Sequence, residues 1–78
     1  MIAEFSVTPI GAGVSVGAYV AKAVQIVHDS GLAYELNPMG TVVEGSWDAV
    51  MAVIRKCHDE LLRECERLSI VIKIDARR

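Results

Sequence analysis

Two hydrophobic periods alternate along this chain, and their order is the feature that most restricts its fold. Residues 2–10 place apolar side chains at every second position, as a strand with one polar face does. Over residues 16–30 the apolar residues instead recur every three or four positions, which is typical of an amphipathic helix. The strand period and then the helix period return in the second half of the chain. This order predicts two successive strand-helix-strand units.

The second helical pattern, over residues 46–65, is the strongest in the chain. Its apolar stripe consists of Trp47, Val50, Met51, Ile54, Cys57, Leu61 and Cys65. Ser46 precedes the stripe, and a serine hydroxyl at that position accepts a hydrogen bond from a free amide of the first turn. The stripe predicted for the first helix consists of Val16, Val20, Ala23, Val24 and Val27. Ser15 is the predicted N-cap of that helix, and Gly31 supplies the left-handed residue that ends it.

Three further segments have the features of strands. Residues 32–37 and 41–44 lie on either side of Asn37-Pro38-Met39-Gly40, which is a natural turn. We therefore expect an antiparallel hairpin there. Residues 68–75 alternate leucine or isoleucine with other residues and predict a final strand.

These elements predict an α+β, ferredoxin-like βαββαβ sandwich, in which two helices cover one face of a four-stranded antiparallel sheet. Right-handed crossovers place the first and last strands side by side, and we expect both in the middle of the sheet. A chain of 78 residues is too short for two cores, so residues 1–78 form one domain. The uncovered face would carry Glu4, Ser6, Thr8, Glu35, Asn37, Val71, Lys73 and Asp75. We expect a second subunit or a ligand to cover this face.

Composition and charge exclude several classes of function. Hydrophobic residues make up 53% of the chain, which favours self-association into a dimer or larger oligomer. The formal net charge of -2 provides no basic field for nucleic acid. An RNA-binding domain of this topology would also display stacking aromatic residues on its central strands, where this sequence has polar residues. No apolar run reaches the roughly 20 residues of a membrane span, and the chain does not begin like a secretory leader. We expect a cytoplasmic protein with no membrane partner.

The chain contains no recognisable catalytic or metal-binding motif. Neither His28 nor His58 has a second ligand four residues away, so we expect no metal site. Nucleophile motifs such as Gly-x-Ser-x-Gly are missing. Cys57 and Cys65 would lie about 12 Å apart on one helix, beyond disulfide reach, and we interpret them as reduced thiols. Gly11-Ala12-Gly13 lacks the further residues of a phosphate-binding loop and is better interpreted as a turn. We therefore expect neither enzymatic activity nor a cofactor.

The hairpin region is chemically the most informative part of the chain. It combines an amide, a hydroxyl, a carboxylate and an indole, at Asn37, Thr41, Glu44 and Trp47. A carboxylate offsets the charge of a cationic heteroaromatic ring, an indole stacks on it, and amide and hydroxyl groups bind its ring nitrogens. The alternative is that Trp47 is a core residue in the first turn of the second helix. The segment predicts non-catalytic binding of a small ligand.

Three segments carry a resemblance to a known family: Met1-Ile-Ala-Glu-Phe-Ser-Val-Thr-Pro-Ile10, Asn37-Pro-Met-Gly-Thr-x-x-Glu-Gly45 and Ile72-Lys-Ile-Asp-x-Arg77. Over nearly its whole length the chain resembles the small thiamine-binding protein family of the YkoF-like superfamily. The resemblance implies a ferredoxin-like domain that pairs through its sheet into dimers and tetramers. It also implies binding of thiamine or its hydroxymethylpyrimidine part without transforming it. The ligand residues that it implies are Ser6, Thr8, Asn37, Met39, Thr41, Glu44 and Trp47.

Similar proteins continue past the last strand into a further segment, whereas this sequence stops at Arg78. We expect this departure to concern the tetramer more than the fold. Two other functions stay open. An ACT-like regulatory module has the same fold and senses an amino acid, which brings a carboxylate, whereas Glu44 and Trp47 suit a cation. A purely structural oligomer would bind no ligand at all.

Overall fold

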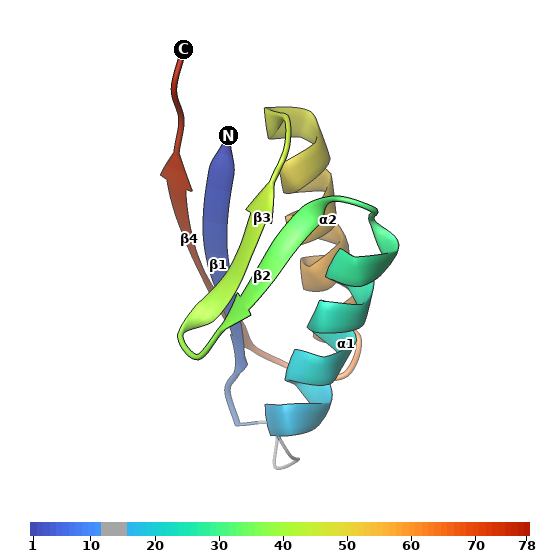
Figure 1. Ribbon diagram of the computed structural model, residues 1–78. Coiled ribbons are helices and arrows are strands. Elements are labelled where there is room, and N and C mark those ends of the chain that lie inside the picture. Colours follow the sequence, from blue (N-terminus) through green and yellow to red (C-terminus); the bar gives the residue numbers. More distant parts are fainter. Residues whose placement is uncertain (12–15) are drawn as a thin grey trace.

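Six helices and strands follow one another in the predicted order in the computed structural model, which describes residues 1–11 and 16–78 (Figure 1). They are β1 (Ile2–Pro9), α1 (Val16–Asp29), β2 (Ala33–Asn37), β3 (Gly40–Glu44), α2 (Trp47–Leu62) and β4 (Leu68–Asp75). The predicted cap at Ser15 and most of the turn Gly11-Ala12-Gly13 fall on residues 12–15, outside the described residues. No helix in the described ranges is long and apolar enough to span a bilayer.

The strands form one antiparallel sheet in the order β2-β3-β1-β4, and both helices cover the same face (Figure 1). This is the predicted ferredoxin-like α+β fold. β1 and β4 are neighbours, as expected. The expectation that both lie in the middle is wrong, because β4 is an edge strand and β3 is the second central strand. Each strand-helix-strand unit joins two parallel strands and leaves room for one strand between them, and an antiparallel strand of the other unit fills that room.

Local signals set the ends of these elements. The Ser46 hydroxyl accepts a hydrogen bond from the Ala49 amide at 3.2 Å, which confirms it as the N-cap of α2. Gly31 follows α1 with a φ of 76°, the left-handed conformation that glycine adopts without strain. The hairpin turns at Pro38 and Met39, because Asn37 pairs with Gly40.

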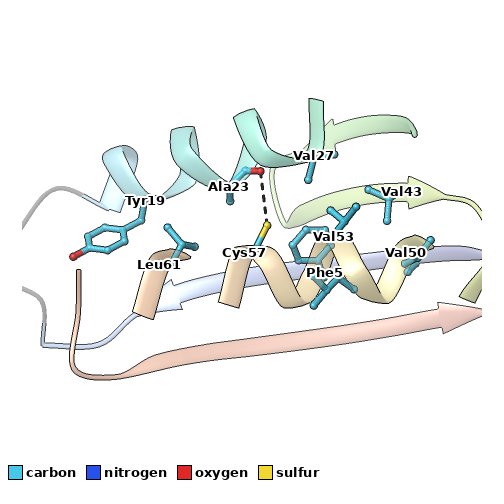
Figure 2. Packing of buried hydrophobic residues seen from close by; sticks show 11 residues of the cluster. Phe5, Tyr19, Ala23, Val27, Val43, Val50, Val53, Cys57 and Leu61 are labelled. Atoms are coloured by element: carbon cyan, nitrogen blue, oxygen red, sulfur yellow. Dashed lines mark hydrogen bonds between the residues drawn. The ribbon is translucent and has the colours of Figure 1, made fainter. Parts of the chain in front are cut away.

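The core lies between the two helices and the covered face of the sheet (Figure 2). Its buried residues are Ala3, Phe5, Tyr19, Ala23, Val27, Val43, Val50, Val53, Ile54, Cys57 and Leu61. Each fully buried valine or leucine contributes roughly 1.5–3 kcal/mol to folding relative to an exposed one. The Cys57 thiol lies 3.9 Å from the Ala23 carbonyl oxygen, where helix meets helix (Figure 2). Burial raises the pKa of this thiol to about 11.

Val20 and Trp47 belong to the predicted stripes, yet both are exposed. Val20 is 46% exposed, and Tyr19 is buried instead. The Tyr19 hydroxyl donates to the Glu64 carbonyl oxygen at 2.7 Å, so a buried ring keeps a partner for its polar end. Trp47 is 58% exposed, so the core interpretation of this indole is wrong. It is the first residue of α2.

Cys65 also departs from the predicted stripe, because α2 ends at Leu62 and this cysteine follows the helix. It is partly buried, and both cysteines are free thiols. The two residues therefore do not share one helix, although the expectation that they form no disulfide is confirmed.

The uncovered face of the sheet has the predicted composition. The register puts Glu4 beside Val42 on one side and Lys73 on the other, all on the face away from the helices. The charged residues of this face are Glu4, Glu35, Glu44, Asp75 and Lys73. The face therefore carries four carboxylates and one lysine. The central strands β1 and β3 place no aromatic side chain on this face.

Candidate functional site

β1 is longer than β3, and this difference opens a gap in the sheet. β3 pairs with β1 as far as Phe5 and Thr41, and the chain then turns away at Pro38 and Met39. β1 continues along β4 to Pro9. Within the part of the chain that the structure describes, the end of β1 therefore has no strand on its β3 side.

This gap is part of a cavity of about 360 Å³, which we call the hairpin cavity. It is lined by Phe5, Ser6, Val7, Thr8, Val20, Ala23, Asn37, Pro38, Met39, Gly40 and Thr41. These residues come from β1, from α1 and from the tip of the β2–β3 hairpin, which lies toward the end of the molecule where α1 begins (Figure 1). The volume is near the lower end of the roughly 300–1,000 Å³ that small-molecule sites occupy. Val20 is exposed because it faces this cavity.

Five of the seven predicted ligand residues line the hairpin cavity, namely Ser6, Thr8, Asn37, Met39 and Thr41. Glu44 and Trp47 do not. Glu44 is the last residue of β3, about 10 Å along the strand from Thr41 at roughly 3.3 Å per residue. Trp47 follows it at the start of α2, toward the end of the sheet where the N-terminus lies (Figure 1). Closeness in sequence grouped these two residues with the hairpin, and an extended strand separates them from it.

The described lining of the hairpin cavity is uncharged. Its polar groups are the hydroxyls of Ser6, Thr8 and Thr41 and the side-chain amide of Asn37. Met39 is 83% exposed at the tip of the turn, where its flexible thioether can fold over a bound ring. The arrangement suits a small neutral heteroaromatic group with hydrogen-bonding edges and apolar faces.

The structure adds two residues that the sequence did not single out as ligand residues. A Cβ at Gly40 would lie 2.9 Å from the Phe5 carbonyl oxygen and 3.2 Å from the Glu4 Cγ, so β1 leaves no room for a side chain there. Glu4 therefore flanks the hairpin cavity on the uncovered face. The sequence signal for Gly40 was a glycine directly after a turn. Nothing local in the sequence relates Glu4 to the hairpin.

Two further surface cavities contain none of the predicted ligand residues. One, of about 310 Å³, lies between α1 and α2, and another, of about 450 Å³, lies between α2 and β4. In residues 1–11 and 16–78 no three His, Cys, Asp or Glu side chains gather as a metal site would require. The His28 Nδ1 atom lies 3.0 Å from the Tyr34 hydroxyl, and the His58 Nδ1 atom lies 2.9 Å from an Asp59 carboxylate oxygen.

Comparison with known proteins places the chain among relatives of the same fold. Residues 3–78 match the family described as thiamine-binding protein. The UPF0045 protein Mb1933 of Mycobacterium bovis is 42% identical over 78 residues, which are 99% of this chain and 76% of the relative. The crystal structure of the hypothetical protein MJ1052 from Methanocaldococcus jannaschii is 38% identical, with a TM-score of 0.91 over 99% of this chain and 79% of that chain. A domain of unknown function from Bacillus cereus is 31% identical, with a TM-score of 0.90 over 97% and 74% of the two chains. The chain therefore belongs to the thiamine-binding protein family.

Proposed function

We propose that this protein binds thiamine, or its hydroxymethylpyrimidine part, in the hairpin cavity and does not transform it. The observation that carries the proposal is the convergence of five predicted ligand residues from two separate segments, β1 and the hairpin, on one cavity. Membership of the thiamine-binding protein family supports the class of ligand.

The pyrimidine is the part of thiamine that the cavity fits. Its ring nitrogens and amino group, and the hydroxymethyl group of the free fragment, match the hydroxyls of Ser6, Thr8 and Thr41 and the amide of Asn37. The apolar side chains of Val20 and Met39 contact the ring faces. The thiazolium is a cation and extends over the uncovered face of the sheet, where Glu4 is the carboxylate beside the cavity.

The cavity supports binding without catalysis. A nucleophilic hydroxyl needs a neighbouring base, and the described lining holds no ionisable side chain. The buried Cys57 thiol belongs to the core, and a pKa of about 11 keeps it protonated and unreactive at neutral pH.

We also propose that the protein self-associates into a dimer or tetramer in the cytoplasm. Two carboxylate-rich uncovered faces repel each other, whereas apolar side chains are exposed along both sheet edges, at Tyr34, Leu36, Ile72 and Ile74.

Glu44 and Trp47 keep their proposed ligand role as groups that a second chain brings to the cavity. A Trp47→Leu chain would then melt like the wild type and bind the ligand more weakly.

Calorimetry and melting curves test the function with thiamine, its phosphates, hydroxymethylpyrimidine and a set of amino acids. A ligand at 100 times its Kd should stabilise the fold by about 2.7 kcal/mol. Thiamine recovered unchanged after incubation would support binding without chemistry. A response to amino acids alone would indicate an ACT-like module, and no response to any compound would indicate a structural oligomer.

A matched pair of variants connects the response to the cavity. Thr41→Val removes a lining hydroxyl and should weaken binding, whereas Ser69→Ala removes a hydroxyl on β4 that does not line the cavity. Equal affinity of both variants and the wild type would contradict the proposed site.

A further inference from the structure

The first observation is the direction in which the backbone groups of β1 point. The N-terminal amine of Met1 donates to the Gly45 carbonyl oxygen at 2.7 Å, and the Gly45 amide donates back to the Met1 carbonyl oxygen at 3.0 Å. Met1 therefore directs both of its backbone groups toward β3. In an antiparallel sheet this direction repeats at every second residue. Ala3, Phe5 and Val7 consequently point their backbone groups to the same side.

A hydrogen bond at the other end of β1 independently gives the same directions for the backbone groups of this strand. The Ile10 amide donates to the Arg67 carbonyl oxygen at 2.9 Å, on the β4 side. Ser6 and Thr8, an even number of residues away, thus direct their backbone groups toward β4. Pro9 has no N–H and is tolerated next to Leu68 because its position faces away from β4.

Val7 is therefore the residue of β1 whose backbone N–H and C=O face the gap in the sheet. The register of β1 with β3 ends at Phe5 and Thr41, and its continuation would put Met39, a turn residue, opposite Val7. Within residues 1–11 and 16–78, no strand pairs with Val7 on this side. Val7 also lines the hairpin cavity. A hydrogen-bond donor and an acceptor thus lie side by side at its wall, where unpaired backbone groups are costly.

We infer that the Val7 backbone recognises the aminopyrimidine edge of the ligand. Its N–H donates to the ring nitrogen next to the amino group, and its C=O accepts a hydrogen bond from that amino group. This inference rests on the proposed function and names the group that makes ligand binding specific. The inference implies discrimination against a pyrimidine that carries a carbonyl in place of the amino group. In such a ring the nitrogen carries a hydrogen and would face the Val7 N–H, and the carbonyl oxygen would face the Val7 C=O.

Oxythiamine has this replacement and is the first probe. Wild-type protein should bind thiamine about a hundredfold more tightly than oxythiamine, since two hydrogen bonds are lost and two buried groups are left unpaired. Equal affinities for the two compounds would overturn the inference while leaving the proposed function intact. If thiamine and hydroxymethylpyrimidine both fail to bind, the proposed function fails, and the inference fails with it.

A variant of the backbone itself is the second probe. Val7→Pro removes the N–H that faces the cavity and, like Pro9, removes no donor to β4. It should lower thiamine affinity about tenfold and reduce the preference over oxythiamine. Val7→Ala keeps the N–H and is the matched control, because it separates the effect of losing the side chain from the effect of losing the N–H. Thiamine affinity of Val7→Pro equal to that of Val7→Ala would contradict the role of the N–H.

Amide hydrogen exchange in the wild type tests whether the Val7 backbone binds the ligand, even if Val7→Pro does not fold. In the free protein the Val7 amide should exchange faster than those of Ser6 and Thr8, which face β4. Saturating thiamine should slow exchange at Val7 at least about tenfold more than at Thr8. Unchanged exchange at Val7 in the presence of bound thiamine would overturn the inference.

Discussion

Gly40 lies so close to β1 that a Cβ at this position would be 2.9 Å from the Phe5 carbonyl oxygen. The hairpin tip and β1 are therefore held together by backbone contact, at the point where the sheet opens into the hairpin cavity. The cavity depends on this contact, because the two segments that meet there supply its polar groups.

Gly40→Ala should consequently impair both stability and binding. The added methyl must displace backbone, which typically costs about 1–3 kcal/mol, and the hairpin should move away from β1. Urea unfolding and calorimetry with thiamine measure the two effects. Gly45→Ala is the control at the other end of β3, where the new Cβ would meet the Leu32 side chain at 3.2 Å. Its stability loss should leave the affinity unchanged.

Glu4→Gln should weaken the binding of thiamine but not that of neutral hydroxymethylpyrimidine. Glu4 flanks the cavity on the uncovered face, and the substitution removes its charge while keeping its shape. A partly exposed ion pair contributes about 0.2–1 kcal/mol, so the expected loss is at most about fivefold. Added salt should reduce the difference from the wild type.

Asp75→Asn is the control for Glu4, because Asp75 lies on the same face at the far end of β4. An equal loss of thiamine affinity in both variants would indicate attraction by the whole acidic face rather than by one carboxylate. An unchanged affinity of Glu4→Gln would remove Glu4 from the site.

The buried thiol predicts a loss of stability at alkaline pH. Burial raises the pKa of Cys57 to about 11 in the folded chain, whereas an unfolded cysteine has a pKa of about 8.5. The folded state then binds the proton more tightly, so this contribution is complete below about pH 8.5 and is lost as the pH rises toward 11. Urea unfolding at pH 8, 9.5 and 10.5 should show a decline that is smaller in Cys57→Ala. Cys65→Ala should decline like the wild type.

Self-association through the β4 edge predicts different results for two adjacent residues. Ile72 is 39% exposed and lies toward the helices, whereas Val71 lies on the uncovered face. Ile72→Lys should dissociate the oligomer in sedimentation equilibrium, because it puts a charge among the apolar side chains through which the β4 edge is proposed to associate, Ile72 and Ile74. Val71→Lys should not. The reverse result would show that the uncovered face is the interface, and a monomeric wild type would exclude both surfaces.

Much of this fold is predictable from the sequence because its signals are local. The second helix, the hairpin turn at Pro38 and the cap at Ser46 depend on residues within a few positions of one another. The alternation along β1 likewise predicts which side chains lie on the uncovered face, since a strand has only two faces. The five predicted residues that line the candidate site came from the family resemblance, and of these only Asn37 and Thr41 had independent support in the sequence.

Tertiary structure decided the rest. The place of β4 at the edge follows from how the two strand-helix-strand units interleave. Val20 faces a cavity, whereas its neighbour Tyr19 is buried in the core. The donor and acceptor of Val7 face the cavity because β3 ends before β1 does. The sequence by itself determined the elements and their faces, through contacts between near neighbours. Strand order, register and the cavity required the tertiary structure, because they depend on pairings between residues far apart in the chain.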